Sequence, residues 1–415
     1  MSELSTGELL ACHDCDHLYR HEPIPTGARA NCRHCGALLY RHIPDSLNRS
    51  IALYCAALLL FFIANCFPFL SLKLSGRVVE NILLSGSWSM YQLGMGELGL
   101  LIFLTSIAFP FAIITGMLYL LIPVRLGVVP RGIGPVYRLV YAVSPWSLVG
   151  VFMLGVLIAI VKLQDLATVL TGTSLYALAA LMVVYSAARA SFDARTFWVH
   201  VPLRRPAPPL VSGGRHLNCH LCGLVAAELP GPLEQRCARC QTLLHARKQD
   251  SLGRTWALLW SAAILLIPAN VYPVMTVIRF GQGEPNTIFG GILHLIESGM
   301  WGLALIVFFA SIVVPLLKLA VLSFLLWSIR KHSHWRPRDR TLLYRVTEAV
   351  GAWSMVDIFL VGLLSALVSL DALSTIRPGI GATFFAAVVV STMFAAHCFD
   401  PRLIWDSAGT VKEPG

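Results

Sequence analysis

Eight of the eleven cysteines form four Cys-x-x-Cys pairs, and these pairs are the residues best suited to chemistry. They fall into two sets, Cys12, Cys15, Cys32 and Cys35, then Cys219, Cys222, Cys237 and Cys240. Two tight turns that each present two thiolates can surround one Zn²⁺ tetrahedrally. Gly36 and Gly223 each directly follow a cysteine, at a position where such a turn leaves little room for a side chain. Each set therefore predicts a zinc ribbon.

Other chemistries use similar cysteine patterns. An iron–sulfur centre takes the same ligands and stays open as an alternative. A thioredoxin-like pair would need a βαβ context, which is missing, and disulfides do not suit the reducing compartment predicted below. Two complete sets leave no need for the neighbouring histidines His13, His34 and His220 as ligands. Because a closed four-cysteine site has no open position for water, we predict two structural zinc ions. We expect the other three cysteines to be small core residues: Cys55, Cys66 and Cys398.

The chain contains two copies of one unit, offset by 205 to 207 residues. Matching segments recur in order: DSLNR (45–49) with DSLGR (250–254), Asn65-x-x-Pro68 with Asn270-x-x-Pro273, Pro110 with Pro315, and FDARTFW (192–198) with FDPRLIW (399–405). A Pro/Gly-rich linker at 201–214 joins the copies. The predicted organisation is a zinc ribbon (1–45), a helical module (46–200), the linker, a second ribbon (215–249), a second module (250–406) and a tail (407–415).

Composition indicates a membrane protein, since 56% of the 415 residues are hydrophobic and only 13% are charged. Each unit has four apolar stretches of the length that a bilayer core requires. They lie near 50–70, 98–122, 140–163, 174–196, 254–274, 300–328, 347–370 and 379–398. The predicted fold class is an all-α polytopic membrane protein made of two tandem four-helix modules, each preceded by a small ribbon.

The positions of basic residues predict the orientation. If the N-terminus is cytosolic, few basic residues lie near the far side: Lys73, Arg77, Lys162, Arg279 and Arg377. Both termini and both ribbons are then cytosolic. The net charge of +10 is explained by this topology, and nucleic-acid binding is not expected. Alternation around glycine at 71–79 and 275–288 predicts a β-hairpin after the first and fifth spans.

Ionisable residues deep in a span are candidates for function. Lys318 and Asp357 lie about ten residues from the same side of the membrane in antiparallel spans, so they could pair. Their equivalents in the first unit are Ile113 and Gly150. Ser311, Ser354 and Thr392 complete the predicted polar network, and Asp165 near the far interface is a weaker candidate. A structural ion pair and a substrate or proton site both remain open.

Two proline positions and several missing motifs complete the prediction. Pro110 and Pro315 interrupt spans and permit kinks. The chain has no phosphate-binding loop, no H-E-x-x-H and no G-x-S-x-G motif. We therefore predict neither a nucleotide site nor an enzyme.

Tandem ribbons that lead through DSL-x-R into four spans, with Asn-x-x-Pro and proline-kinked helices, resemble the paraquat-inducible protein A family over essentially the whole chain. The resemblance implies tetraspanin- or claudin-like modules in a Gram-negative inner membrane. It also implies a periplasmic MCE-domain tunnel protein as partner and phospholipid as cargo, so the expected function is intermembrane lipid transport, with coupling to protons one option. Three alternatives stay open: a stand-alone proton-coupled carrier of lipophilic compounds, a membrane redox or stress protein, and a structural anchor.

Overall fold

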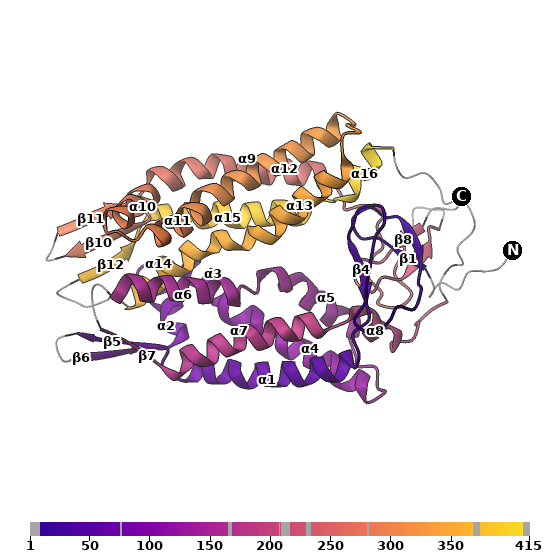
Figure 1. Ribbon diagram of the computed structural model, residues 1–415, viewed down its shortest axis with the longest axis horizontal. Coiled ribbons are helices and arrows are strands. Elements are labelled where there is room, and N and C mark those ends of the chain that lie inside the picture. The colour runs from indigo at the N-terminus through magenta and orange to yellow at the C-terminus, as the bar shows by residue number, and fades with distance from the viewer. Residues whose placement is uncertain are drawn as a thin grey trace.

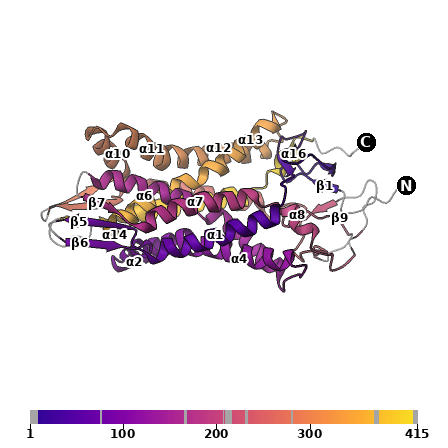
Figure 2. The ribbon, with the colours of Figure 1, turned by 60° about the horizontal axis from the view of Figure 1, so that its bottom comes forward.

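The computed structural model places two helical bundles side by side, one from each half of the chain (Figure 1). It describes residues 9–409 except 75–76, 165–167, 207, 209–215, 230–233, 280–281 and 368–373. Two three-stranded sheets lie at one end of the bundles, which we call the hairpin end. The cysteine sets lie at the opposite end, which we call the cysteine end, and a turned view shows the same arrangement (Figure 2).

The elements of the first half follow one order from the cysteine strands to a short terminal helix. They are β1 (Leu9–Ala11), β2 (Leu18–Arg20), β3 (Arg29–Asn31), β4 (Leu38–Arg41), α1 (Ser46–Cys66), β5 (Leu70–Leu74), β6 (Arg77–Asn81), α2 (Leu83–Gln92), α3 (Gly96–Phe103), α4 (Phe109–Arg125), α5 (Ile133–Val143), α6 (Val149–Gln164), β7 (Thr168–Thr171), α7 (Thr173–Ser191) and α8 (Ala194–Val199).

The helices and the hairpin-end strands of the second half repeat that order. Its elements are β8 (His216–Asn218), β9 (Val225–Ala227), α9 (Ser251–Val271), β10 (Met275–Arg279), β11 (Gln282–Asn286), α10 (Ile288–Glu297), α11 (Trp301–Phe308), α12 (Val314–Arg330), α13 (Pro337–Gly351), α14 (Val356–Leu367), β12 (Ser374–Pro378), α15 (Ile380–Cys398) and α16 (Arg402–Ser407).

Eight helical segments in the described residues are long and apolar enough to cross a membrane, which confirms the predicted number. The third and seventh begin earlier than expected, at Ile133 and Pro337. The reason is local: a short 3₁₀ turn joins α5 to α6, and another joins α13 to α14, so each pair forms one bent span.

Each of the two proline-interrupted spans contains a π-helical turn just before its proline. Residues Leu104–Ala108 and Phe309–Val313 are π-helical, and Pro110 and Pro315 lie in the first turn of the α-helix that follows. Proline has no N–H to donate, and the first turn of a helix leaves that donor unused in any case. The wide turn thus accommodates each proline within a continuous span.

Small sheets at the hairpin end make the fold mostly, not entirely, helical. The predicted hairpins are present as β5–β6 and β10–β11. A third strand that the sequence pattern missed, β7 or β12, pairs antiparallel with β5 or β10. Gly172 and Gly379 follow these third strands, and a Cβ on either would lie within about 2 Å of the Pro68 or Pro273 carbonyl oxygen. Only glycine permits that approach.

The repeated DSL and FD motifs meet at the cysteine end. In the first half, Ser46 donates a hydrogen bond to the Ser191 carbonyl and accepts one from the Asp193 amide, at 2.8 and 2.9 Å. Ser251 makes the same two bonds in the second half, with the Cys398 carbonyl and the Asp400 amide. These serines join the first and last spans of each bundle.

The two bundles share one apolar interface. Phe152 of α6 and Phe359 of α14 meet edge to face, with ring centroids 5.3 Å apart. Gly155 of α6 lies against the Phe359 Cβ, so that α6 and α14 pack closely. The bundles are therefore parts of one packed core.

The prediction for the three remaining cysteines is wrong. Cys55 and Cys66 are exposed, and Cys398 is only partly buried. Hydrophobic composition alone did not reveal the direction of these side chains, because a span is apolar on the side that faces lipid as well as on the side that faces the core.

Candidate metal centres and intramembrane polar site

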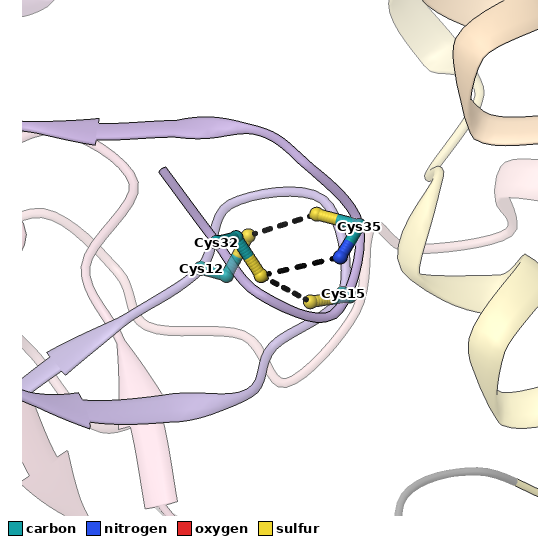
Figure 3. Close-up of side chains that lie close together, drawn as sticks. All are labelled: Cys12, Cys15, Cys32 and Cys35. Atoms are coloured by element: carbon teal, nitrogen blue, oxygen red, sulfur yellow. Dashed lines mark hydrogen bonds between the residues drawn. The ribbon is translucent and has the colours of Figure 1, made fainter. Parts of the chain in front are cut away.

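The cysteines of each set converge at the tips of short β-hairpins. In the first set, Sγ–Sγ distances are 3.4 Å for Cys12–Cys35 and 3.5 Å for Cys15–Cys32 (Figure 3). In the second set, the Cys219–Cys240 and Cys222–Cys237 distances are both 3.4 Å. Within each set all four sulfurs lie within 4.8 Å of one another and are buried. Sulfurs that surround one metal tetrahedrally at ~2.3 Å have this spacing.

All four Cys-x-x-Cys pairs form the same turn. The residue after each second cysteine has a positive φ, and its amide donates to the carbonyl of the first cysteine. These residues are Asp16, Gly36, Gly223 and Gln241. The two glycines fit the expected knuckle positions, while Asp16 and Gln241 adopt the same conformation without being glycine. Because the turn repeats four times, each set presents its sulfurs to a common centre.

The chemistry of these buried thiols favours a bound cation. The neighbouring Cys219 thiol, together with burial, raises the pKa of Cys222 far above its ordinary value. Four clustered sulfurs cannot all ionise without a positive charge to compensate them. The residues present therefore fit a tetrahedral metal ion with no open coordination position, which would act in folding rather than catalysis.

The first cysteine module (residues 9–41) packs against the second half of the chain. Arg345 of α13 donates to the Asp14 carboxylate at 2.6 Å and to the Cys35 carbonyl at 3.3 Å. The His34 and Trp405 ring centroids are 4.2 Å apart. All four cysteines of this module belong to an apolar cluster with α12, α15 and α16.

The second cysteine module (residues 216–244) packs against the first half. Arg138, the counterpart of Arg345, donates to Thr242 at 3.2 Å. A Cβ on Gly134 would lie 2.3 Å from the Cys240 carbonyl oxygen, so α5 approaches the cysteine turn as closely as glycine allows. Each module thus lies across the bundle of the other copy, which the sequence order does not suggest.

An arginine just after the second module joins the first module to the last helix. Arg247 contacts the Asp16 carboxylate at 2.6 Å and the Asp406 carboxylate at 2.7 Å. The hydrogen bonds to Asp406, aided by Asp16, raise the pKa of Arg247 against the effect of burial. Its charge is thus permanently available to this contact.

The intramembrane site centres on Lys318, which is 2% exposed within α12. Its Nζ donates to the Gly351 carbonyl oxygen at 2.6 Å and to the Thr392 hydroxyl at 3.4 Å. A Cβ on Gly351 would lie 3.0 Å from the lysine Cε. Gly351 is a member of the site that sequence analysis missed, because nothing near it in sequence indicates that a lysine approaches it.

The other predicted network residues are placed less completely. Ser311, Ser354 and Thr392 are all buried on spans of the second half. Ser311 bonds the Val307 carbonyl of its own helix, and the Ser354 hydroxyl has no hydrogen-bond partner among the described residues. The Asp357 side chain and the whole of Asp165 lie outside the described part of the chain, so the Lys318–Asp357 pair stays a prediction.

The corresponding region of the first half is closed. Ile113 takes the place of Lys318, and Tyr185 takes the place of Thr392. The Tyr185 hydroxyl donates to Ser147 at 3.0 Å, and Ser147 is the counterpart of Ser354. In the second half the smaller Thr392 leaves that serine without its tyrosine and leaves room for a lysine.

A sequence model of the paraquat-inducible protein A family matches the chain twice, at residues 47–202 and 252–409. The chain belongs to this family. It is 33% identical over 405 residues to the intermembrane transport protein PqiA of Escherichia coli strain K12, covering 96% of this chain and 95% of that protein. It is 31% identical over 407 residues to the lipophilic envelope-spanning tunnel protein A of the same strain, covering 98% and 93%.

A more distant relative is a probable intermembrane transport protein of Haemophilus influenzae, 27% identical over 412 residues with 96% of each chain covered. No solved structure matches the chain. Family membership and eight helices of membrane-spanning length make this a multi-pass membrane protein of a family whose members are named for transport.

Proposed function

We propose that the protein is an inner-membrane subunit of an intermembrane lipid transport system. In this proposal the second half handles the phospholipid head group, and a periplasmic MCE-domain tunnel protein receives or supplies the lipid at the hairpin end. The names of the relatives support transport between membranes. The excess of basic residues near the cysteine end supports a cytosolic location for both termini and both cysteine modules, each with one structural zinc ion.

The observation that carries the proposal is Lys318. A buried lysine held by a carbonyl and a hydroxyl can attract a phosphate when it is protonated, or exchange a proton with Asp357 during transport. In the first half Ser147 accepts a hydrogen bond from Tyr185. Its counterpart in the second half, Ser354, has no tyrosine at the equivalent position. The second half is therefore the half built to bind a polar group within the membrane.

The test replaces Lys318 with methionine, which keeps the length of the side chain and removes its charge. When the Lys318→Met variant is present in the membrane at normal abundance, it is expected not to complement a defect in envelope lipid homeostasis. Ile113→Met in the first half is the matched control and should complement fully. Full complementation by Lys318→Met would show that the charge is structural.

A second experiment addresses the partner. The proposal expects a periplasmic MCE-domain protein to co-purify with the detergent-solubilised chain. Lipid movement in proteoliposomes by the chain alone, with no such partner in native pull-downs, would favour a stand-alone carrier.

A further inference from the structure

A cavity of about 560 Å³ lies between the two halves at the cysteine end. Equivalent positions of the two copies line it from opposite sides: His13 with His220, and Tyr141 with Glu348. It therefore lies along the axis that relates the copies. A water molecule takes up about 30 Å³ of liquid, so the cavity has room for on the order of ten waters.

The cavity reaches from the cysteine modules to the intramembrane lysine. Lys318 and Gly351 both line it, and these are the two residues joined by the 2.6 Å hydrogen bond. Glu348 lies one helical turn before Gly351 on the same face of α13, toward the cysteine end. The residues that line the cavity thus lead from the cysteine modules past Glu348 to Lys318.

Glu348 is one of three acids that line the cavity, with Asp14 and Asp400, and its counterpart in the first half is Tyr141. It is exposed in the cavity, and its carboxylate makes no hydrogen bond or ion pair with another described residue. Lys248 is the cation with the largest electrostatic effect on Glu348. Its ammonium group nevertheless donates its hydrogen bonds to the carbonyls of His397 and Phe399. Charged and titratable groups face the cavity from every surrounding element: His13, Asp14, Tyr141, Arg189, His220, His245, Lys248, Tyr344, His397, Asp400 and Arg402.

We propose that this cavity is a water-filled entrance through which protons move between the cysteine end and Lys318, with Glu348 as the relay. Glu348 takes a proton from cavity water and passes it through water to the neutral lysine amine, which becomes an ammonium, and the reverse order releases it. The proposal rests on the proposed function, which places the cysteine end in the cytosol and couples transport to protons.

Two cysteine substitutions at similar depth test the entrance. Met393 lines the cavity next to Thr392, whereas Leu317 lies beside Lys318, does not line the cavity and is 43% exposed. Met393→Cys and Leu317→Cys are made with serine at the three cysteines outside the metal clusters. A charged, membrane-impermeant methanethiosulfonate is added to inverted and to right-side-out vesicles, and labelled peptides are read by mass spectrometry.

Met393→Cys is expected to react at least tenfold faster from the cysteine end than from the hairpin end, and Leu317→Cys should react from neither. Failure of Met393→Cys to react from the cysteine end would overturn the entrance. This labelling requires no lipid movement, so it can fail or succeed independently of the proposed function.

The relay is tested in proteoliposomes that contain a pH-sensitive dye. After a pH jump, Glu348→Gln is expected to slow proton uptake about tenfold, while Glu348→Asp retains most of it. Proton uptake by the wild-type chain no faster than by empty liposomes, or an unchanged rate for Glu348→Gln, would overturn the relay. The Met393→Cys labelling, repeated in the Glu348→Gln background, checks that the cavity is still open.

Discussion

The two halves have their spans and hairpin-end strands in the same order along the chain, but they differ at the centre of the bundle. The first half closes its central region with a tyrosine–serine hydrogen bond, Tyr185 to Ser147. The second half places Lys318 there, bonded to Thr392, and its Ser354 hydroxyl has no hydrogen-bond partner in the described part of the chain. Under the proposed function, one copy keeps a stable scaffold while the other carries a buried lysine whose burial costs stability.

The cysteine clusters are the feature in which the halves are most alike, and their loss should have the largest effect. Cys35→Ser and Cys240→Ser are each expected to lower bound zinc from two ions to one per chain and to destabilise the protein by more than about 5 kcal/mol. Metal analysis and thermal unfolding in detergent measure this. Cys55→Ser, outside both clusters, should change neither. Iron with visible absorption in place of zinc would contradict the prediction.

The aspartates of the repeated FD motif should differ in importance. Burial opposes ionisation of Asp400, but the bonds from Arg402 and the Lys248 amide outweigh it and lower the pKa of Asp400. Asp400→Asn should cost about 3 kcal/mol, because it removes one partner of a buried pair. Asp193→Asn should cost about 1 kcal/mol, because Asp193 only caps α8.

The pH dependence of stability tests the same aspartate. A lowered folded-state pKa means that Asp400 contributes stability above its unfolded pKa of about 3.9, and that this contribution is lost as the pH falls through the folded value. The unfolding temperature of the wild type should therefore fall further between pH 5 and pH 3 than that of Asp400→Asn. Parallel curves would show that the pair does not contribute.

An exchange of the central residues tests the comparison directly. Thr392→Tyr copies the closed arrangement of the first half into the second and should abolish transport, with a stability cost of about 2 kcal/mol from overpacking. The reverse change, Tyr185→Thr, should cost a similar amount by leaving a cavity while transport persists. Transport assays on the two variants at equal membrane abundance test this exchange. Loss of transport in both variants would mean that both halves take part in transport.

The contacts of the modules with the opposite bundles should give the smallest effects. Arg345→Ala is expected to cost about 1 to 2 kcal/mol, because Arg345 pairs with the buried Asp14. Arg138→Ala removes a hydrogen bond to the uncharged Thr242 hydroxyl and should lower the free energy of unfolding by about 0.5 to 1 kcal/mol. Unfolding temperatures of the two variants test this order, and equal values would show that charge does not distinguish the contacts.

Much of the fold could be predicted because its signals are local. Runs of apolar residues gave the eight spans, alternation around glycine gave both hairpins, and paired cysteines gave both clusters. The third strands β7 and β12 were missed because each is short and follows a long apolar run. Gly351 was missed because its role depends on a side chain from a different span.

Residue type and spacing were enough to predict which residues can bind a metal, which segments cross the membrane and which half carries the lysine. The position of each cysteine module on the opposite bundle and the cavity between the copies became visible in the folded chain alone. Those features depend on how distant surfaces fit together, as where α5 meets a cysteine turn at Gly134. Pairing of this kind leaves no periodic signal in the sequence.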